Sequence, residues 1–183
     1  MSAQSGGRRD AQRNRQLLLD AALSAFTNTP GTVSLESIAT SAGVGIGTLY
    51  RHFPSREALI EAVYRSELDQ LCAEATELLD AHRPDLALRT WLGRYAEFVA
   101  TKRGMAEAVR EVIAAGAVTS AQTRERLSTA IGSILAAGAG LLRSDVRAED
   151  VTAAMAGATL AGTDRAQIDR LLDLLVDGLI RPR

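Results

Sequence analysis

Apolar residues recur with the period of an α-helix in almost every segment between chain-breaking residues. In the first such segment, Leu18, Ala22 and Phe26 mark one helix face, which stops at the Asn-Thr-Pro-Gly run over 28–31. No segment shows the bounded alternation of β-branched residues that predicts a strand. We therefore predict an all-α fold of about nine helices. After the first helix, the expected helices cover 34–41, 46–53, 56–81, 85–102, 104–115, 119–143, 148–162 and 165–180.

Composition and rare residues narrow the class of protein. A chain of 183 residues with 46% apolar residues can bury a core without disulfides or metal ions. Its one cysteine, Cys72, cannot form an internal disulfide, and His52 and His82 stand too far apart for a zinc-ligand pattern. We therefore expect no metal and no cofactor. The lack of an apolar signal peptide and of a membrane-length apolar run predicts a cytoplasmic protein.

The charge is distributed unevenly along the chain. Residues 1–56 carry six arginines against three acids, a net +3, which leaves −4 for the rest of a chain whose net charge is −1. A basic end on a near-neutral chain is a candidate surface for phosphate groups.

A pair of short helices with a glycine-containing turn between them is predicted over 34–52. Ser34 can cap the first helix, and Gly43 can adopt the left-handed conformation that ends it. This arrangement fits the helix-turn-helix, whose second helix enters the major groove of DNA. Gly45, Gly47 and Thr48 keep the exposed side of the second helix thin enough to approach DNA closely. The side chains expected to reach phosphates or base edges are Tyr50, Arg51 and His52.

A longer motif surrounds this pair of helices. Its residues are Ile38-Ala39-x-x-Ala42-Gly43-Val44-x-x-Gly47-Thr48-Leu49-Tyr50-x-His52-Phe53-Pro54-Ser55-x-Glu57-x-Leu59. The motif resembles the DNA-binding domain of tetracycline-repressor (TetR) family regulators, and the resemblance is close over residues 10–60. It implies that the rest of the chain forms a helical ligand-binding and dimerisation domain. We therefore expect a disordered tail over 1–7, a helix-turn-helix domain over 8–56 and an effector-binding and dimerisation domain over 57–183.

The resemblance also implies roles for individual residues. Tyr50, His52 and Arg56 are expected to contact phosphates, Ser34 to meet a phosphate at its helix start, and the third helix to read bases. Arg56 stands where the family commonly has Lys, and Gly45 where it often has a small polar residue. The predicted DNA-contacting residues are Ser34, Gly45, Gly47, Thr48, Tyr50, Arg51, His52 and Arg56.

Other classes of function find less support in the sequence. The glycine-rich segment 43–48 lacks the lysine of a nucleotide-binding P-loop and the strand that would precede it. No nucleophile, base and orienting residue come together in any motif, so we predict that the chain is not an enzyme. A helical enzyme and a helical small-molecule-binding protein without DNA recognition are kept as the alternatives.

An aromatic stripe marks the helix expected over 85–102. Trp91, Tyr95 and Phe98 share one face, which is either plain core or the wall of an effector cavity, as the resemblance implies for this helix. A cavity lined by rings and methionines would accept a mainly hydrophobic effector, and an anionic one if Lys102 points inward. The predicted effector-binding residues are Trp91, Tyr95, Phe98, Lys102, Met105 and Met155.

The last two expected helices carry small residues and an apolar stripe. Such surfaces pack either within the chain or against a second copy, as two DNA half-sites require. The predicted dimer-interface residues are Ala154, Ala158, Ile168, Leu171, Leu172, Leu175 and Leu179. Together these patterns predict a homodimeric transcriptional regulator, a repressor that a small hydrophobic effector releases from operator DNA.

Overall fold

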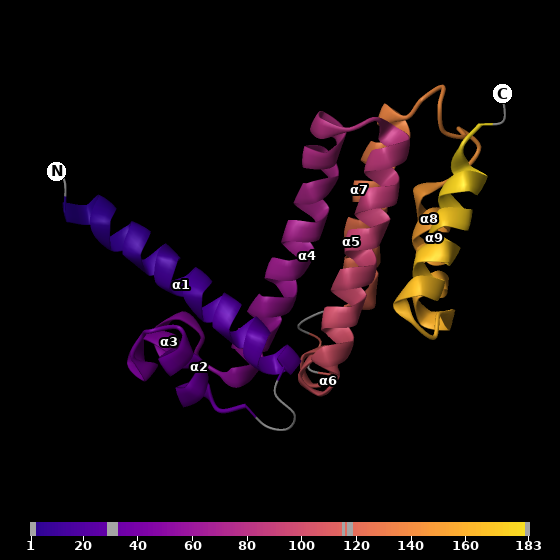
Figure 1. The fold of residues 1–183 in the computed structure, drawn as a ribbon. Coiled ribbons are helices and arrows are strands. Elements are labelled where there is room, and N and C mark those ends of the chain that lie inside the picture. Colours follow the sequence, from indigo (N-terminus) through magenta and orange to yellow (C-terminus); the bar gives the residue numbers. More distant parts are fainter. Residues whose placement is uncertain (1–2, 29–32, 115, 117–118, 182–183) are drawn as a thin grey trace. The chain divides into compact units, whose positions relative to one another are not determined.

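The structure, a computed structural model, describes residues 3–28, 33–114, 116 and 119–181. Over these residues the chain forms nine helices and no β-structure beyond two isolated bridges, which confirms the predicted all-α fold (Figure 1). The helices are α1 (Ala3–Asn28), α2 (Leu35–Ser41), α3 (Ile46–His52), α4 (Arg56–Ala81), α5 (Pro84–Gly104), α6 (Ala106–Ala114), α7 (Ser120–Ala137), α8 (Ala148–Ala161) and α9 (Arg165–Leu179). Within those same ranges, no helix is both long and apolar enough to cross a membrane.

The helices gather into two compact units. The first comprises Met1–Ser66 and Thr101–Val118, and the second comprises Glu67–Ala100 and Thr119–Arg183. The long helices α4 and α5 each contribute residues to both units. The domain boundary expected at residue 56 falls inside the first unit and stays a prediction, because the two units are defined by packing alone.

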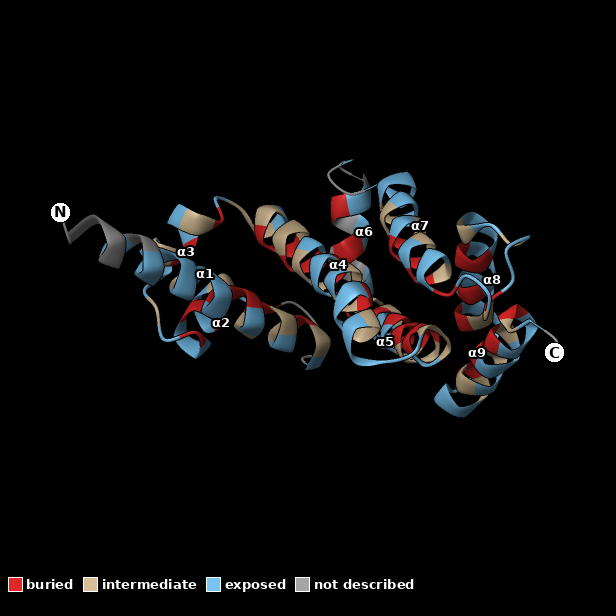
Figure 2. Cartoon of the chain, turned by 90° about the horizontal axis from the view of Figure 1, so that it is seen from above, coloured by how far each residue is buried: buried red, intermediate tan, exposed pale blue. Residues whose placement is uncertain are grey.

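The core of the first unit forms where α1, α2 and α3 pack together. Leu18, Ala22 and Phe26 are buried on one face of α1, as their helical spacing predicts. Ile38 from α2 and Leu49 from α3 are fully buried and fix the angle between these two short helices. Figure 2 shows these buried faces in red.

The core of the second unit draws one apolar side chain or more from each of its helices. Trp91 from α5, Ile131 from α7, Met155 from α8 and Leu172 from α9 are all fully buried. The indole Nε1 of Trp91 donates a 2.7 Å hydrogen bond to the carbonyl oxygen of Leu71 in α4. Because this bond satisfies the only polar atom of the ring, Trp91 can be buried at no polar cost.

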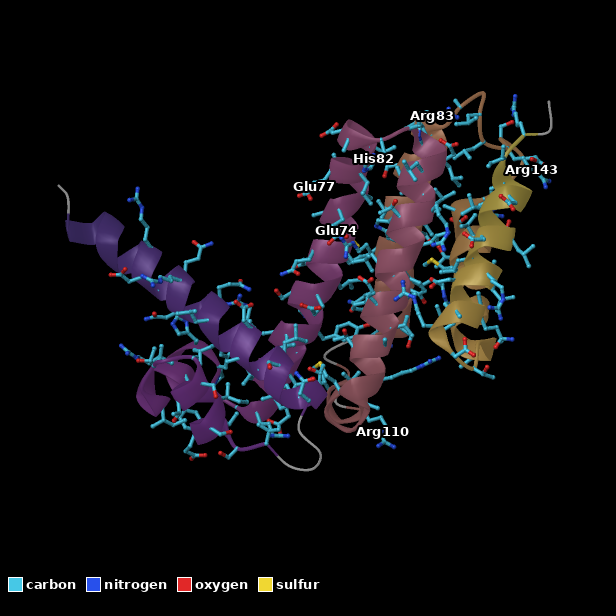
Figure 3. The ribbon with its side chains drawn as sticks, in the orientation of Figure 1. Glu74, Glu77, His82, Arg83, Arg110 and Arg143 are labelled. Carbon is cyan, nitrogen blue, oxygen red and sulfur yellow. The ribbon has the colours of Figure 1, made fainter. Side chains whose placement is uncertain are left out.

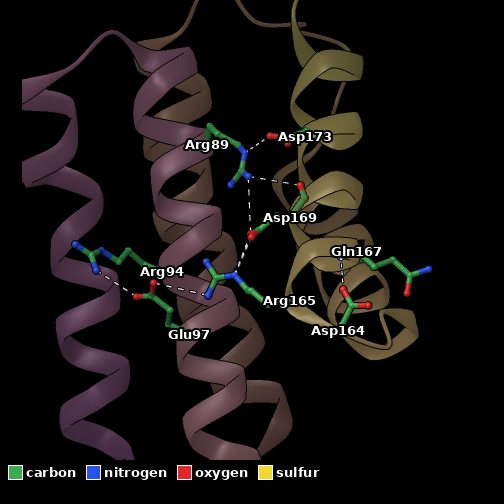
Figure 4. Close-up of polar contacts among 8 residues, drawn as sticks. All are labelled: Arg89, Arg94, Glu97, Asp164, Arg165, Gln167, Asp169 and Asp173. Atoms are coloured by element: carbon green, nitrogen blue, oxygen red, sulfur yellow. Dashed lines mark hydrogen bonds and ion pairs between the residues drawn. The ribbon is translucent and has the colours of Figure 1, made fainter.

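Ion pairs between α5 and α9 fix the rotation of α9 in this unit (Figure 4). Arg89 is paired with Asp173 and lies 3.9 Å from Asp169. Arg165 reaches Asp169 at 3.0 Å and Glu97 at 3.7 Å. A single exposed ion pair contributes less than about 1 kcal/mol, but a network of several orients the helix that carries it. The side of α9 that carries Asp169 and Asp173 therefore faces α5.

The helix expected over 119–143 is shorter in the structure, and it ends within the Ala-rich stretch 136–140. α7 ends at Ala137 with Gly138 as its C-cap, and Gly140 has a φ of 96°. Only glycine adopts that conformation readily. The chain then pairs with the end of α9, where the Arg143 amide donates to the Leu179 carbonyl at 2.8 Å. The apolar residues after Ala137 therefore belong to a turn rather than to the helix.

The tail expected to be disordered over 1–7 also differs in its described part. α1 begins at Ala3, so residues 3–7 are helical. The helical hydrogen-bond ladder propagates through the glycines of this segment, since glycine lowers helix stability by only about 1 kcal/mol per residue.

The predicted dimer-interface residues differ in exposure. Ile168, Leu172 and Leu179 are buried within their own chain and leave little surface for a partner. They belong to the stripe by which α9 packs on its own unit, the alternative left open by the sequence. The four other predicted residues keep at least partial exposure: Ala154, Ala158, Leu171 and Leu175. Two leucines outside the prediction are far more exposed, Leu160 at 81% and Leu174 at 67%.

The predicted effector residues divide between the two units. Trp91, Tyr95, Phe98 and Met155 are buried in the second unit. The Trp91 and Tyr95 rings are stacked with their centroids 6.4 Å apart, and Tyr95 lies 6.5 Å from Phe98. Met105 is buried in the first unit, where the ammonium of Lys102 lies 5.6 Å above the ring of Tyr64.

Candidate nucleic-acid interface

Ser34 caps the start of α2. Its Oγ accepts a 3.1 Å hydrogen bond from the Ser37 amide, and the Ser37 hydroxyl donates in return to the Ser34 carbonyl at 2.8 Å. The acidic Glu36 lies in the first turn, where the partial positive charge of the helix favours it. The cap predicted from sequence is therefore confirmed. Ser34 is exposed, and its predicted contact with a phosphate stays a prediction.

Gly43 makes the turn that sets α3 against α2. Its φ is 68°, in the left-handed region, as its place after the first helix predicts. The amides of Gly43 and Val44 donate 3.0 Å hydrogen bonds to the carbonyls of Thr40 and Ala39. These bonds satisfy the last carbonyls of α2, so the turn is rigid and the direction of α3 is fixed.

The outer face of α3 carries few side-chain atoms. Gly45 is its N-cap and Gly47 lies in its first turn, and at both positions an added Cβ would meet nothing within 4 Å. Leu49 is the buried anchor of the helix, whereas Tyr50 is 46% exposed. The backbone on this face can therefore approach a flat partner more closely than a helix with full side chains.

Arg51 and Thr48 form a polar pair on the same helix. The Arg51 Nη2 donates to Thr48 Oγ1 at 2.8 Å, and its Nε donates to the Gly47 carbonyl at 3.4 Å. A guanidinium carries five N–H donors, so these bonds orient the side chain and leave others to bind phosphate. Arg51 is exposed, while His52 is half-buried with its ring 6.2 Å from that of Phe53.

Arg56 is engaged within the protein. Its Nη1 donates a 2.5 Å hydrogen bond to the Val33 carbonyl, and its guanidinium carbon lies 5.2 Å from the centre of the Phe26 ring. The side chain is half-buried, and it holds the start of α4 against the end of α1 and the entry to α2. Arg56 therefore links α4 to α1 and to the entry of α2, and the phosphate contact that the resemblance implies for it stays a prediction.

Two residues of this surface were missed by the sequence reasoning. Arg15 of α1 lies 5.4 Å from the centre of the Phe53 ring, a contact between distant parts of the chain that no local pattern signals. Ile46 is 36% exposed on α3. The signal for Ile46 was available, because it lies one turn before Tyr50 and so shares its helix face.

A catalytic or metal site finds no support in the structure. Burial raises the pKa of the Cys72 thiol, which keeps it protonated and weakens it as a nucleophile. In the part of the chain that the structure describes, no group of three or more His, Cys, Asp or Glu side chains could hold a metal ion.

The geometry agrees with the family to which the sequence is similar. Residues 18–63 match the family model described as bacterial regulatory proteins of the tetR family. Residues 83–181, more than half of the chain, match the C-terminal domain of SbtR-like transcriptional regulators. The chain belongs to the TetR family. The predicted class, a helix-turn-helix transcriptional regulator and not an enzyme, is thereby confirmed.

Solved structures of TetR regulators share the whole fold. The regulator SCO0520 from Streptomyces coelicolor is 42% identical, over 92% of this chain and 99% of that one, with a TM-score of 0.81. A TetR regulatory protein from Mycobacterium vanbaalenii is 28% identical over 95% of this chain and 99% of its own, with a TM-score of 0.75.

Curated relatives match over a shorter stretch. The transcriptional repressor LfrR from Mycolicibacterium smegmatis is 41% identical over 64 residues, 35% of this chain and 32% of LfrR. The regulator SAR0097 from Staphylococcus aureus is 35% identical over 74 residues, 39% of each chain. The matched part thus spans between about a third and two fifths of these curated relatives.

Proposed function

We propose that this chain is a homodimeric repressor that binds operator DNA through α3 and is released by a small hydrophobic effector. The observation that carries the proposal is the outer face of α3, where open space at Gly45 and Gly47 adjoins the exposed Tyr50 and Arg51. A helix that enters the major groove needs this combination of close approach and phosphate-binding side chains. The name of LfrR, a transcriptional repressor, supports the direction of regulation.

Replacing Gly47 with alanine tests this use of α3. The added methyl meets no atom of the protein, and alanine favours helix by about 1 kcal/mol over glycine, so we expect unchanged or higher thermal stability. Against DNA the methyl occupies the space needed for close approach. Binding to DNA flanking the protein's own gene should weaken about ten-fold, equivalent to about 1.4 kcal/mol of steric cost.

The control is Gly132→Ala in α7, where the added Cβ would make an ordinary 3.8 Å contact with Ala148. Gel-shift titrations and thermal melts of both variants separate the helix effect from the DNA effect. Equal DNA affinity of Gly47→Ala and wild type would show that α3 does not enter the groove. A wild-type protein that binds no duplex would favour the alternative, a ligand-binding protein without DNA recognition.

We propose that dimerisation uses the exposed side of α8 and α9. Leu160 and Leu174 lie on these two helices, which pack against each other, and both expose most of their apolar surface. Small neighbours such as Ala154 and Gly157 allow a second copy to approach closely. Two recognition helices about 34 Å apart, one turn of DNA, require such a pairing for selectivity.

Leu174→Arg should therefore dissociate the dimer. A charge placed in an apolar interface costs about 2 kcal/mol, so we expect the dimer dissociation constant to rise about thirty-fold, as measured by sedimentation. Leu86→Arg, at another exposed leucine in α5, should stay dimeric. If Leu174→Arg sediments as a dimer, the interface does not lie on this side of α8 and α9.

The effector part of the proposal rests on the aromatic stripe of α5. Trp91, Tyr95 and Phe98 offer rings in a buried, apolar environment, which suits a hydrophobic small molecule. Such a molecule releases DNA only if it prefers the arrangement in which the recognition helices no longer match the groove, since equal affinity for both states shifts nothing. Because α4 contributes residues to both units, it is the element we expect to transmit the change.

A hollow in the second unit has a different character. It has a volume of about 820 Å³ and lies where the chain after α7 meets the end of α9. Arg143 and Asp145 in its lining, the former labelled in Figure 3, bind each other through two hydrogen bonds of 3.0 and 2.7 Å. These bonds lower the pKa of Asp145 to about 2. Because four charged residues line this hollow, we keep the α5 stripe as the proposed site for a hydrophobic effector.

A further inference from the structure

An apolar side chain is partly exposed on the outer face of α3. Ile46 is 36% exposed, and the residue that anchors α3 in the core is Leu49, which is fully buried. Exposing an isoleucine to water forfeits the stabilisation that burial would give it. Ile46 and Tyr50 lie one helical turn apart, so the two exposed side chains share one face.

The two residues that flank Ile46 carry no side chains. Gly45 and Gly47 flank it, and at both positions the space within 4 Å of a Cβ is empty. Neither flanking residue can therefore cover Ile46 from a partner that approaches this face.

The polar side chains of the same helix are directed elsewhere. Thr48 Oγ1 accepts from the Arg51 guanidinium at 2.8 Å, and Arg51 also donates to the Gly47 carbonyl. Their bond draws both polar groups toward each other, further along the helix than Ile46. At its first position α3 thus offers a DNA base an apolar side chain, while the Thr48 hydroxyl is engaged with Arg51.

One base presents an apolar group in the major groove. Thymine carries a 5-methyl group there, and aliphatic side chains recognise it by direct contact. We propose that Ile46 is a specificity-determining residue that contacts the 5-methyl group of one thymine in each operator half-site. The inference rests on the proposed function, since it assumes that α3 enters the major groove.

Uracil in place of thymine tests this contact, because it removes the 5-methyl group and leaves base pairing intact. The probe is a duplex selected by the wild-type protein from a random-sequence library long enough for two half-sites one helical turn apart. Each thymine is replaced in turn by deoxyuridine. We expect one position per half-site at which wild-type affinity falls about four-fold, the effect of one buried methyl-sized group, and about fifteen-fold when both half-sites are changed.

The variant Ile46→Ala should bind thymine and deoxyuridine duplexes equally, and Ile46→Val should retain part of the discrimination. Both should stay folded and keep wild-type affinity for a non-selected duplex, because phosphate contacts are unchanged. Leu86→Ala, which trims an exposed leucine on α5, should discriminate as the wild type does.

Two results would overturn the inference while the proposed function stands: tolerance of deoxyuridine at every position, or an equal deoxyuridine penalty in Ile46→Ala and wild type. Failure of the wild-type protein to select any sequence would instead overturn the proposed operator binding, and the Ile46 contact with it.

Discussion

Operator affinity is expected to fall about 10³- to 10⁵-fold when the salt concentration rises from about 50 to about 200 mM, the loss that accompanies about six to ten phosphate contacts. This expectation rests on the positive charge of residues 1–56, which hold six arginines against three acids and are present twice in a dimer. Each phosphate contact releases cations that were bound to the DNA. This release becomes less favourable as the salt concentration rises, so the affinity falls. Fluorescence anisotropy at a series of salt concentrations gives the slope of log K against log salt.

Single variants separate two roles for arginine in this slope. Arg51 is exposed on α3, so Arg51→Ala should make the slope shallower by about 0.9 for each protomer that loses a phosphate contact. Arg56 instead binds the Val33 carbonyl and lies over Phe26. Arg56→Ala should weaken binding to specific and random DNA alike by loosening the helix-turn-helix, yet leave the slope unchanged.

The matched control is Arg83→Ala, at an exposed arginine paired with Asp85 in the second unit and labelled in Figure 3. It should change neither affinity nor slope. A slope that becomes shallower in Arg56→Ala by as much as in Arg51→Ala would support the phosphate contact that the family resemblance implies for Arg56.

Tyr50→Ala should weaken all DNA binding, whereas Thr48→Ala should change the preference between operators.

The helix-turn-helix can be predicted from the sequence because its signals are local. Ser34 caps the helix that begins at the next residue by accepting from an amide three residues away, and Gly43 ends that helix through its own left-handed backbone. The contact of Arg56 with Val33 lies beyond such reasoning, since it joins residues 23 positions apart and depends on how α1 and α4 pack. The same limit applies to Arg15 over Phe53.

The second unit is harder to predict because its patterns allow two outcomes. The stripe on α9 is apolar enough either for its own chain or for a partner, and only the structure shows that Ile168, Leu172 and Leu179 pack inside their own unit. The sequence does not indicate the end of α7, because the apolar pattern continues past Ala137. Only the pairing of Arg143 with Leu179, across the unit, shows that the chain has already turned.

The aromatic stripe on α5 also allows two interpretations, plain core or the wall of a cavity, and variants of Trp91 distinguish them. Its side chain has no exposed surface, and its Nε1 is hydrogen-bonded to Leu71. Trp91→Ala should therefore lower the free energy of unfolding by about 3–5 kcal/mol, the usual cost of truncating a core aromatic. Urea denaturation followed by circular dichroism measures this without the lost tryptophan. Trp91→Phe keeps most of the volume but loses the hydrogen bond, so it should cost about 1–2 kcal/mol.

Leu86→Ala, at an exposed position on the same helix, should stay within about 0.5 kcal/mol of wild type. A small loss of stability in Trp91→Ala would mean that the ring borders space that can remain empty, and the stripe would then be a cavity wall. In that case the variant should keep its operator affinity but need a much higher concentration of any effector found to co-purify with the wild type. A loss of several kcal/mol instead places the stripe in the core, so an effector could bind there only by displacing packed rings, at a cost in affinity equal to that repacking.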